Sequence, residues 1–168
     1  YVGSGTARNM ALLGVVAGEM QSYATWHQPS NAAYKIIDEN GAHKEIEYWP
    51  YANIRSANEL LRILSNASFD EETIELKISE TRWLRAYLYF ELVKRFGGVP
   101  LITEQQSIDQ PQESLFVSRD KEKEVYDFIA AEMDDLVDIL PDSYGGADYG
   151  RPTKWAAYAL KSRAMLYA

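Results

Sequence analysis

The sequence contains no cysteine among its 168 residues. This absence excludes disulfide bonds, thiolate catalysis and every zinc motif that includes a cysteine ligand. A chain of this length can bury about 70% of its unfolded surface around one core, so it does not need disulfides to fold. The sequence therefore predicts one compact domain, and the cysteine count leaves its redox environment open.

Basic residues and long apolar runs are also scarce. Seventeen Lys and Arg against 25 Asp and Glu give a formal net charge of -8, which repels phosphate backbones and anionic membrane surfaces. We therefore expect no nucleic-acid partner.

The longest apolar run, residues 10–18, is about half of the roughly 20 residues that a spanning helix needs, so we expect no transmembrane helix. No basic and then apolar segment opens the chain, so we expect any export signal to lie outside it.

Motifs for catalysis and for metal or phosphate binding are missing as well. His27 and His43 are sixteen residues apart and form neither H-x-x-x-H nor H-E-x-x-H, the spacings that place two imidazoles on one metal. The sequence holds no G-x-S-x-G, glycine-rich phosphate loop or D-x-D-x-D-G calcium loop. We therefore expect a protein that is not an enzyme, with no catalytic residue, cofactor or metal.

What the sequence does contain is a long apolar helix over residues 70–96. At about 100° per residue its apolar side chains point to every side of the helix, which is typical of a helix enclosed by others. These side chains are Trp83, Leu84, Ala86, Tyr87, Leu88, Tyr89, Phe90, Leu92, Val93 and Phe96. Arg82 and Arg85 share one face, and we expect Glu80 or an acid on a neighbouring helix to pair with them.

The ends of this helix carry recognisable signals. Ser68 with Glu71 three residues later forms a capping-box pattern, and Asp70 is a competing N-cap. Gly97 and Gly98 can take the left-handed C-cap conformation, and proline at position 100 prevents continuation.

Four further segments have helical periodicity, which predicts an all-α fold of about five main helices joined by long loops. We expect these helices over residues 6–24, within residues 48–66 with Pro50 in the first turn, from a cap at Ser118 or Asp120 to Pro141, and from Thr153 onward. Between them, residues 26–44 form either a hairpin or a short helix. Residues 103–118 are predicted to be a polar loop, with extended ends at 101–102 and 115–117.

Four of the predicted helical segments resemble the SusD/RagB family of outer-membrane nutrient-binding lipoproteins. TRWLRAYLYFELVKRFGGVPLIT, which begins at Thr81, resembles the family signature R-F-L-R-A-Y-x-Y-F-x-L-V-x-x-F-G-x-V-P-L. The helix from Tyr51 carries Y-x-x-I-x-x-A-N, and the last two helices follow the family wording. Trp155 stands where a glycine is usual and Lys161 where a leucine is usual. The resemblance covers residues 51–168.

The resemblance implies a tetratricopeptide-like arrangement of helix hairpins, an alpha-alpha superhelix. It further implies a surface-exposed outer-membrane protein that binds a nutrient, most often an oligosaccharide, and delivers it to a TonB-dependent SusC-like transporter. Its lipid anchor would lie outside this chain. The last helix runs to Ala168 without a polar face, so we expect residues 1–168 to be a single N-terminal helical domain and a fragment of a longer protein.

Candidate sugar-binding residues follow from chemistry, because aromatic rings stack on sugar C–H faces while adjacent polar groups bond to hydroxyls. Trp26 with His27, and Tyr48 with Trp49, have this composition. Tyr144 and Tyr149 have it to a lesser degree. The family's ligand contacts lie on variable loops, so no motif transfers them to this chain. The alternative interpretation is a helical-repeat scaffold that binds a protein partner and no sugar.

Overall fold

The computed structural model describes residues 49–107 and 109–168, and within them the backbone forms helices and no strand. The helices are α3 (Tyr51–Leu64), α4 (Glu71–Phe96), α5 (Gln112–Leu115), α6 (Glu122–Leu136) and α7 (Lys154–Tyr167), with a short 3-10 turn, η2 (Gly146–Asp148). This confirms the all-α prediction. The helix expected at residues 6–24 and the segment 26–44 lie outside the described residues.

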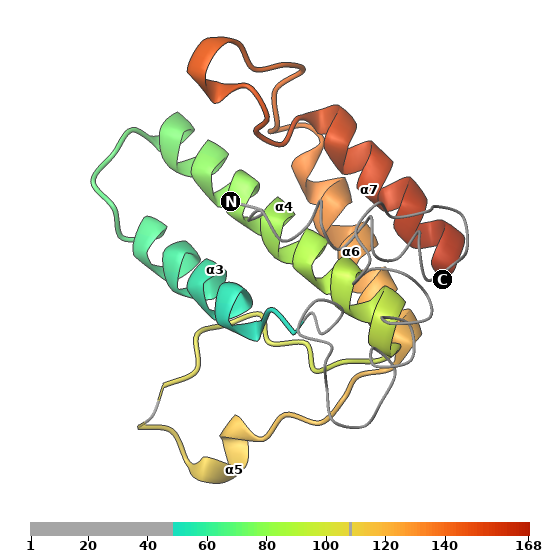
Figure 1. Cartoon of the computed structure of the whole chain (residues 1–168). Helices are drawn as coiled ribbons and strands as arrows, with labels where there is room; N and C mark the ends of the chain where they lie inside the picture. The colour runs from blue at the N-terminus through green and yellow to red at the C-terminus, as the bar shows by residue number, and fades with distance from the viewer. Residues whose placement is uncertain (1–48, 108) are drawn as a thin grey trace, which may run out of the picture. The chain divides into compact units, whose positions relative to one another are not determined.

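Helix α4 lies between α3 and α6 and packs against both (Figure 1). It contacts α3 and α6 along much of its length, and α7 packs mainly on α6 with a smaller contact to α4. Consecutive helices are joined by loops that turn the chain back, so the described part is built from helix hairpins, as the family resemblance implies.

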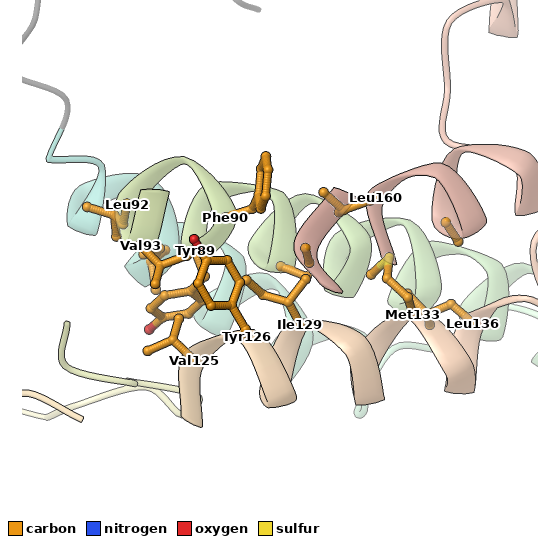
Figure 2. Packing of buried hydrophobic residues seen from close by; sticks show 14 of the residues in the cluster. Tyr89, Phe90, Leu92, Val93, Val125, Tyr126, Ile129, Met133, Leu136 and Leu160 are labelled. Carbon is orange, nitrogen blue, oxygen red and sulfur yellow. The ribbon is translucent and has the colours of Figure 1, made fainter. Parts of the chain in front are cut away.

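The core confirms that α4 is enclosed (Figure 2). Its buried side chains meet those of α6 and α7 in one cluster. Tyr89 packs edge-on against Phe128 of α6, with ring centroids 5.5 Å apart, and Phe90 packs edge-on against Tyr167 of α7 at 5.8 Å. Leu84 departs from the prediction, because half of its surface remains exposed.

The start of α4 decides between the two predicted caps. The helix begins at Glu71, and the carboxylate of Asp70 accepts a hydrogen bond from the Thr73 backbone N–H at 2.8 Å. The capping box predicted for Ser68 was therefore wrong, because Ser68 lies two residues before the N-cap. At the other end Gly97 has φ of 66° and its N–H donates to the carbonyl of Val93, which confirms a glycine C-cap.

Helix α6 is shorter at both ends than predicted. Neither Ser118 nor Asp120 caps it, because the helix begins at Glu122 and the Asp120 carboxylate instead accepts a hydrogen bond from Leu101 N–H at 2.8 Å. At its end the N–H groups of Ile139 and Leu140 both donate to the carbonyl of Leu136. This shared acceptor tightens the backbone into turns, so the regular helix stops well before Pro141.

The loop after α4 has more local structure than the sequence suggested. Helix α5 follows Pro111, and Leu115, predicted to be extended, is its last residue. Phe116 follows α5 and is exposed.

Helix α7 begins where the sequence predicts. The Thr153 hydroxyl accepts a hydrogen bond from Ala156 N–H at 3.3 Å. The two departures from the family pattern lie on its outer surface: Trp155 is 59% exposed, and Lys161 forms an ion pair with Asp134 of α6 at 2.5 Å. Neither side chain disturbs the core.

Glu91, near the end of α4, links stability to pH. Burial raises the pKa of Glu91, but hydrogen bonds from Lys94 and Arg95, both at 2.5 Å, outweigh burial and lower that pKa below its ordinary 4.5. A carboxyl with a lowered folded-state pKa stabilises the fold above its unfolded pKa and loses this contribution as pH falls through the folded pKa. We expect stability to drop below about pH 4.5 and Glu91→Gln to flatten this part of the profile. Urea denaturation between pH 7 and pH 3 measures it, and equal profiles for both proteins would contradict the expectation.

Candidate functional site

Of the four sugar-binding residues proposed from the sequence, Trp26, His27 and Tyr48 lie outside the described residues. Trp49 is described and is 45% exposed, immediately before Pro50 and α3. Whether the four side chains come together stays a prediction.

The two weaker candidates separate clearly. Tyr149 is 87% exposed in the loop before α7. Tyr144 donates a hydrogen bond from its hydroxyl to Glu80 of α4 at 2.7 Å. Burial and this bond raise the pKa of Tyr144 well above its usual range. Tyr144 therefore holds the loop to α4, and Tyr149 alone of the two presents a free ring face.

The segment after α4, residues 100–104, forms no helix or strand and is held in place by side chains of α3. Tyr51 donates its hydroxyl hydrogen to the Pro100 carbonyl at 2.7 Å. The amide of Asn58 donates to the carbonyls of Ile102 at 2.8 Å and Glu104 at 3.2 Å. Buried backbone groups need hydrogen-bond partners. In a sheet a neighbouring strand provides these partners, whereas here the side chains of α3 provide them.

Helix α4 completes this arrangement from the other side. The Tyr89 hydroxyl accepts from Ile102 N–H at 2.7 Å and donates to the carbonyl of the same residue at 3.1 Å. Burial raises the pKa of Tyr89 to about 12, so the hydroxyl keeps its proton. Arg85 Nη1 donates to the Thr103 carbonyl at 2.7 Å and to Asn58 Oδ1 at 2.9 Å.

A buried acid on α6 balances the two arginines. Glu132 accepts from Arg85 Nη2 at 3.1 Å and from Arg82 Nη2 at 2.9 Å, and Arg82 also reaches Asp135. This confirms that an acid of a neighbouring helix pairs with both. Glu80, the other expected partner, instead binds Arg151 at 2.6 Å and accepts from Tyr144.

A pocket of about 340 Å³ lies between the first half of α3 and the segment that Asn58 and Arg85 hold. It is lined by Tyr51, Ala52, Ile54, Arg55, Asn58, Ile102, Glu104 and Gln106. Across residues 49–107 and 109–168, neither the Arg55 guanidinium nor the Glu104 carboxylate forms a hydrogen bond or an ion pair. Gln106 donates only a long 3.4 Å bond to the Leu115 carbonyl.

This composition suits a small polar ligand that also has apolar faces. Donors, acceptors and aliphatic surface converge on one pocket. The described residues include no cluster of His, Cys, Asp and Glu able to hold a metal ion. Sequence reasoning missed the pocket because only the register of Tyr51, Arg55 and Asn58 on one helix face is visible in the sequence, whereas their approach to Glu104 depends on how the chain returns after α4.

The sequence and the structure of this chain were both found to be similar to those of known proteins. A family model described as "Starch-binding associating with outer membrane" matches residues 4–166. A SusD-like protein of Bacteroides ovatus is 28% identical over 98% of this chain and 28% of its own length.

Solved structures give the same result. A SusD-like protein of Bacteroides fragilis is 39% identical and superposes with a TM-score of 0.64 over 70% of this chain and 22% of its own. A laminarin-binding SusD-like protein is 35% identical, with a TM-score of 0.65 over 71% of this chain and 26% of its own. The chain therefore spans little more than a quarter of the curated relative. No helix in the described ranges is long and apolar enough to cross a bilayer.

Proposed function

Because the chain belongs to the SusD-like family, described as starch-binding and associating with the outer membrane, we propose that it forms part of a cell-surface protein that captures a glycan and delivers it to a TonB-dependent SusC-like transporter. The family match over residues 4–166 is the observation that carries this proposal. Capture and delivery need no covalent step, and the helix hairpins serve as the scaffold that presents the binding residues.

We also propose that residues 1–168 are the N-terminal helical portion of a longer protein. The small share of each relative that the chain covers supports this. So does α7, which presents an outer face without charged side chains, formed by Trp155, Tyr158, Ala159, Ser162, Met165 and Leu166. Such faces are normally covered. The complete reading frame tests the proposal, and a stop codon directly after Ala168 would contradict it.

Surface location and transport follow from the same family membership. We propose attachment to the outer membrane by a lipid anchor outside this chain, with the protein facing the medium. Antibody labelling of intact cells tests the location, and absence of label on cells that express the protein would contradict it.

Affinity purification from solubilised outer membranes tests the transporter partner. The absence of a TonB-dependent transporter from the eluate would count against delivery.

For the binding residues we keep the sequence-based proposal of Trp26, His27, Tyr48 and Trp49. We expect Trp26→Ala and Trp49→Ala each to weaken glycan binding by the full-length protein about tenfold or more, because each removes a ring that stacks on a sugar face. Calorimetry against a glycan panel measures this. Phe69→Ala is the matched control, since Phe69 is an exposed aromatic residue in the loop between α3 and α4.

Two results would argue against this proposal. Equal losses in the control and in the tryptophan variants would show that the effect is not local. No binding across the panel would favour the second candidate, a helical-repeat scaffold for a protein partner, which the hairpin architecture supports.

A further inference from the structure

We propose that the pocket between α3 and residues 102–106 binds one ring of an uncharged sugar. This inference rests on the proposed glycan-capture function and assigns it a subsite that the sequence did not indicate. Four observations carry it: the charges of the lining, its hydrogen-bonding capacity, its support and its size.

The charges in the pocket cancel. Arg55 and Glu104 both line it, and they form no ion pair with each other or with any other group in the described part of the chain. Together the two opposite charges give the pocket no net charge, so it does not favour a uronic acid or an amino sugar. Each charge can instead form a charge-assisted hydrogen bond to a neutral hydroxyl group.

The hydrogen-bonding groups match those of a sugar. A hydroxyl both donates and accepts, a carboxylate only accepts, a guanidinium only donates, and an amide does both. In the pocket Glu104 provides the carboxylate, Arg55 the guanidinium and Gln106 the amide. The exposed Ala52 and the half-buried Ile102 add aliphatic surface for the C–H faces of the ring. Both polar atoms of Asn58 are already bonded within the protein, so Asn58 forms the wall and not a contact.

The wall of the pocket is fixed before a ligand arrives. Ile102 is held through its N–H by Tyr89 and through its carbonyl by Tyr89 and Asn58. Thr103 is held by Arg85. A wall ordered in the free protein loses little entropy on binding. The support therefore lies in the same buried network that connects α3, α4 and α6.

The size limits the ligand. About 340 Å³ lies at the lower end of the roughly 300–1,000 Å³ typical of small-molecule sites. The pocket can thus enclose about one ring, and the rest of an oligosaccharide would extend outside it.

A paired substitution on α3 tests the assignment. Ala52 lines the pocket and is exposed, so Ala52→Trp would fill it without disturbing the core. Asn53 is also exposed, lies next to it and points to another side of the helix, so Asn53→Trp is the matched control. Calorimetry of the full-length protein uses a panel of neutral glycans that includes maltoheptaose and laminarihexaose, with oligogalacturonate as the anionic probe. We expect Ala52→Trp to weaken neutral binding at least tenfold, Asn53→Trp to leave it unchanged, and oligogalacturonate to bind far more weakly than the neutral glycans.

A second pair of variants tests the roles of the charges. Arg55→Ala and Glu104→Gln remove one donor set and one charged acceptor without altering the buried network, and each is expected to reduce neutral binding several-fold. Their circular dichroism should match the unsubstituted protein.

The outcomes separate the two proposals. Neutral binding that is equal in Ala52→Trp and Asn53→Trp would overturn the pocket assignment and leave glycan capture standing. Preference for oligogalacturonate would overturn the assignment to an uncharged sugar. Absence of binding to every glycan would overturn the pocket and the proposed function together.

Discussion

Replacing Arg85 with alanine is expected to destabilise the fold by about 3–5 kcal/mol, the cost of breaking a buried ion pair from one side. The side chain of Arg85 is only 7% exposed. Its removal takes a partner from Glu132 and leaves Asn58 Oδ1 and the Thr103 carbonyl without the bonds that now satisfy them. Arg82 still binds Glu132, which keeps the expected loss toward the lower end of this range. Urea denaturation followed by circular dichroism measures the change.

A matched arginine on the surface shows whether burial is the cause. Arg55 is exposed and forms no ion pair with the described residues, so Arg55→Ala should change stability by no more than about 0.5 kcal/mol. Hydrogen exchange adds a local measurement: in Arg85→Ala the Ile102 amide should exchange faster, because the network that holds residues 100–104 is loosened. Similar unfolding free energies for the two variants would refute this account of Arg85.

The sequence indicated the parts of the fold that depend on local chemistry. Helix α4 was predictable because apolar residues on all its sides require neighbours, and its end was predictable because few residues other than glycine adopt the conformation of Gly97. The pairing of Arg82 and Arg85 with an acid from another helix followed from the cost of burying an unpaired charge.

The parts that the sequence did not indicate depend on contacts between distant segments. The spacing of Glu132 from Ile129 and Leu136 places it on the apolar side of α6, but which side chains of α4 it meets depends on how the two helices pack. Asp120 looked like a helix cap, but the chain returning after α4 offers it the Leu101 N–H. The pocket could not be predicted for the same reason, since its two sides come from residues 51–58 and 102–106.

Replacing Gly98 with alanine is the second change for which we expect a large loss of stability. Backbone conformation alone would suggest that Gly97→Ala costs more than Gly98→Ala, but the atoms around Gly98 reverse that order. Gly97 has the left-handed φ of 66°, and a Cβ there would have Glu122 Oε2 at 3.8 Å as its neighbour. Gly97→Ala should therefore cost about 2 kcal/mol, because φ of 66° with ψ of -139° is a conformation that residues with a Cβ rarely adopt. A Cβ on Gly98 would overlap the Asp120 carbonyl oxygen and lie 3.2 Å from Glu122 N. These are backbone atoms at the start of α6, so relief requires the turn after α4 and the start of α6 to move apart.

We expect Gly98→Ala to cost about 3 kcal/mol, at the upper end of ordinary overpacking, and more than Gly97→Ala. Thermal unfolding of the two variants beside Gly145→Ala measures the order, since a Cβ on Gly145 would meet no atom within 4 Å and should leave the midpoint nearly unchanged. A smaller loss in Gly98→Ala than in Gly97→Ala would mean that residues 98 and 120 do not approach closely. The Asp120 N–H would then not reach the Val99 carbonyl, to which it donates at 3.3 Å. The Asp120 carboxylate would also lose its place beside Leu101, so the pocket wall formed by the next residues depends on this glycine.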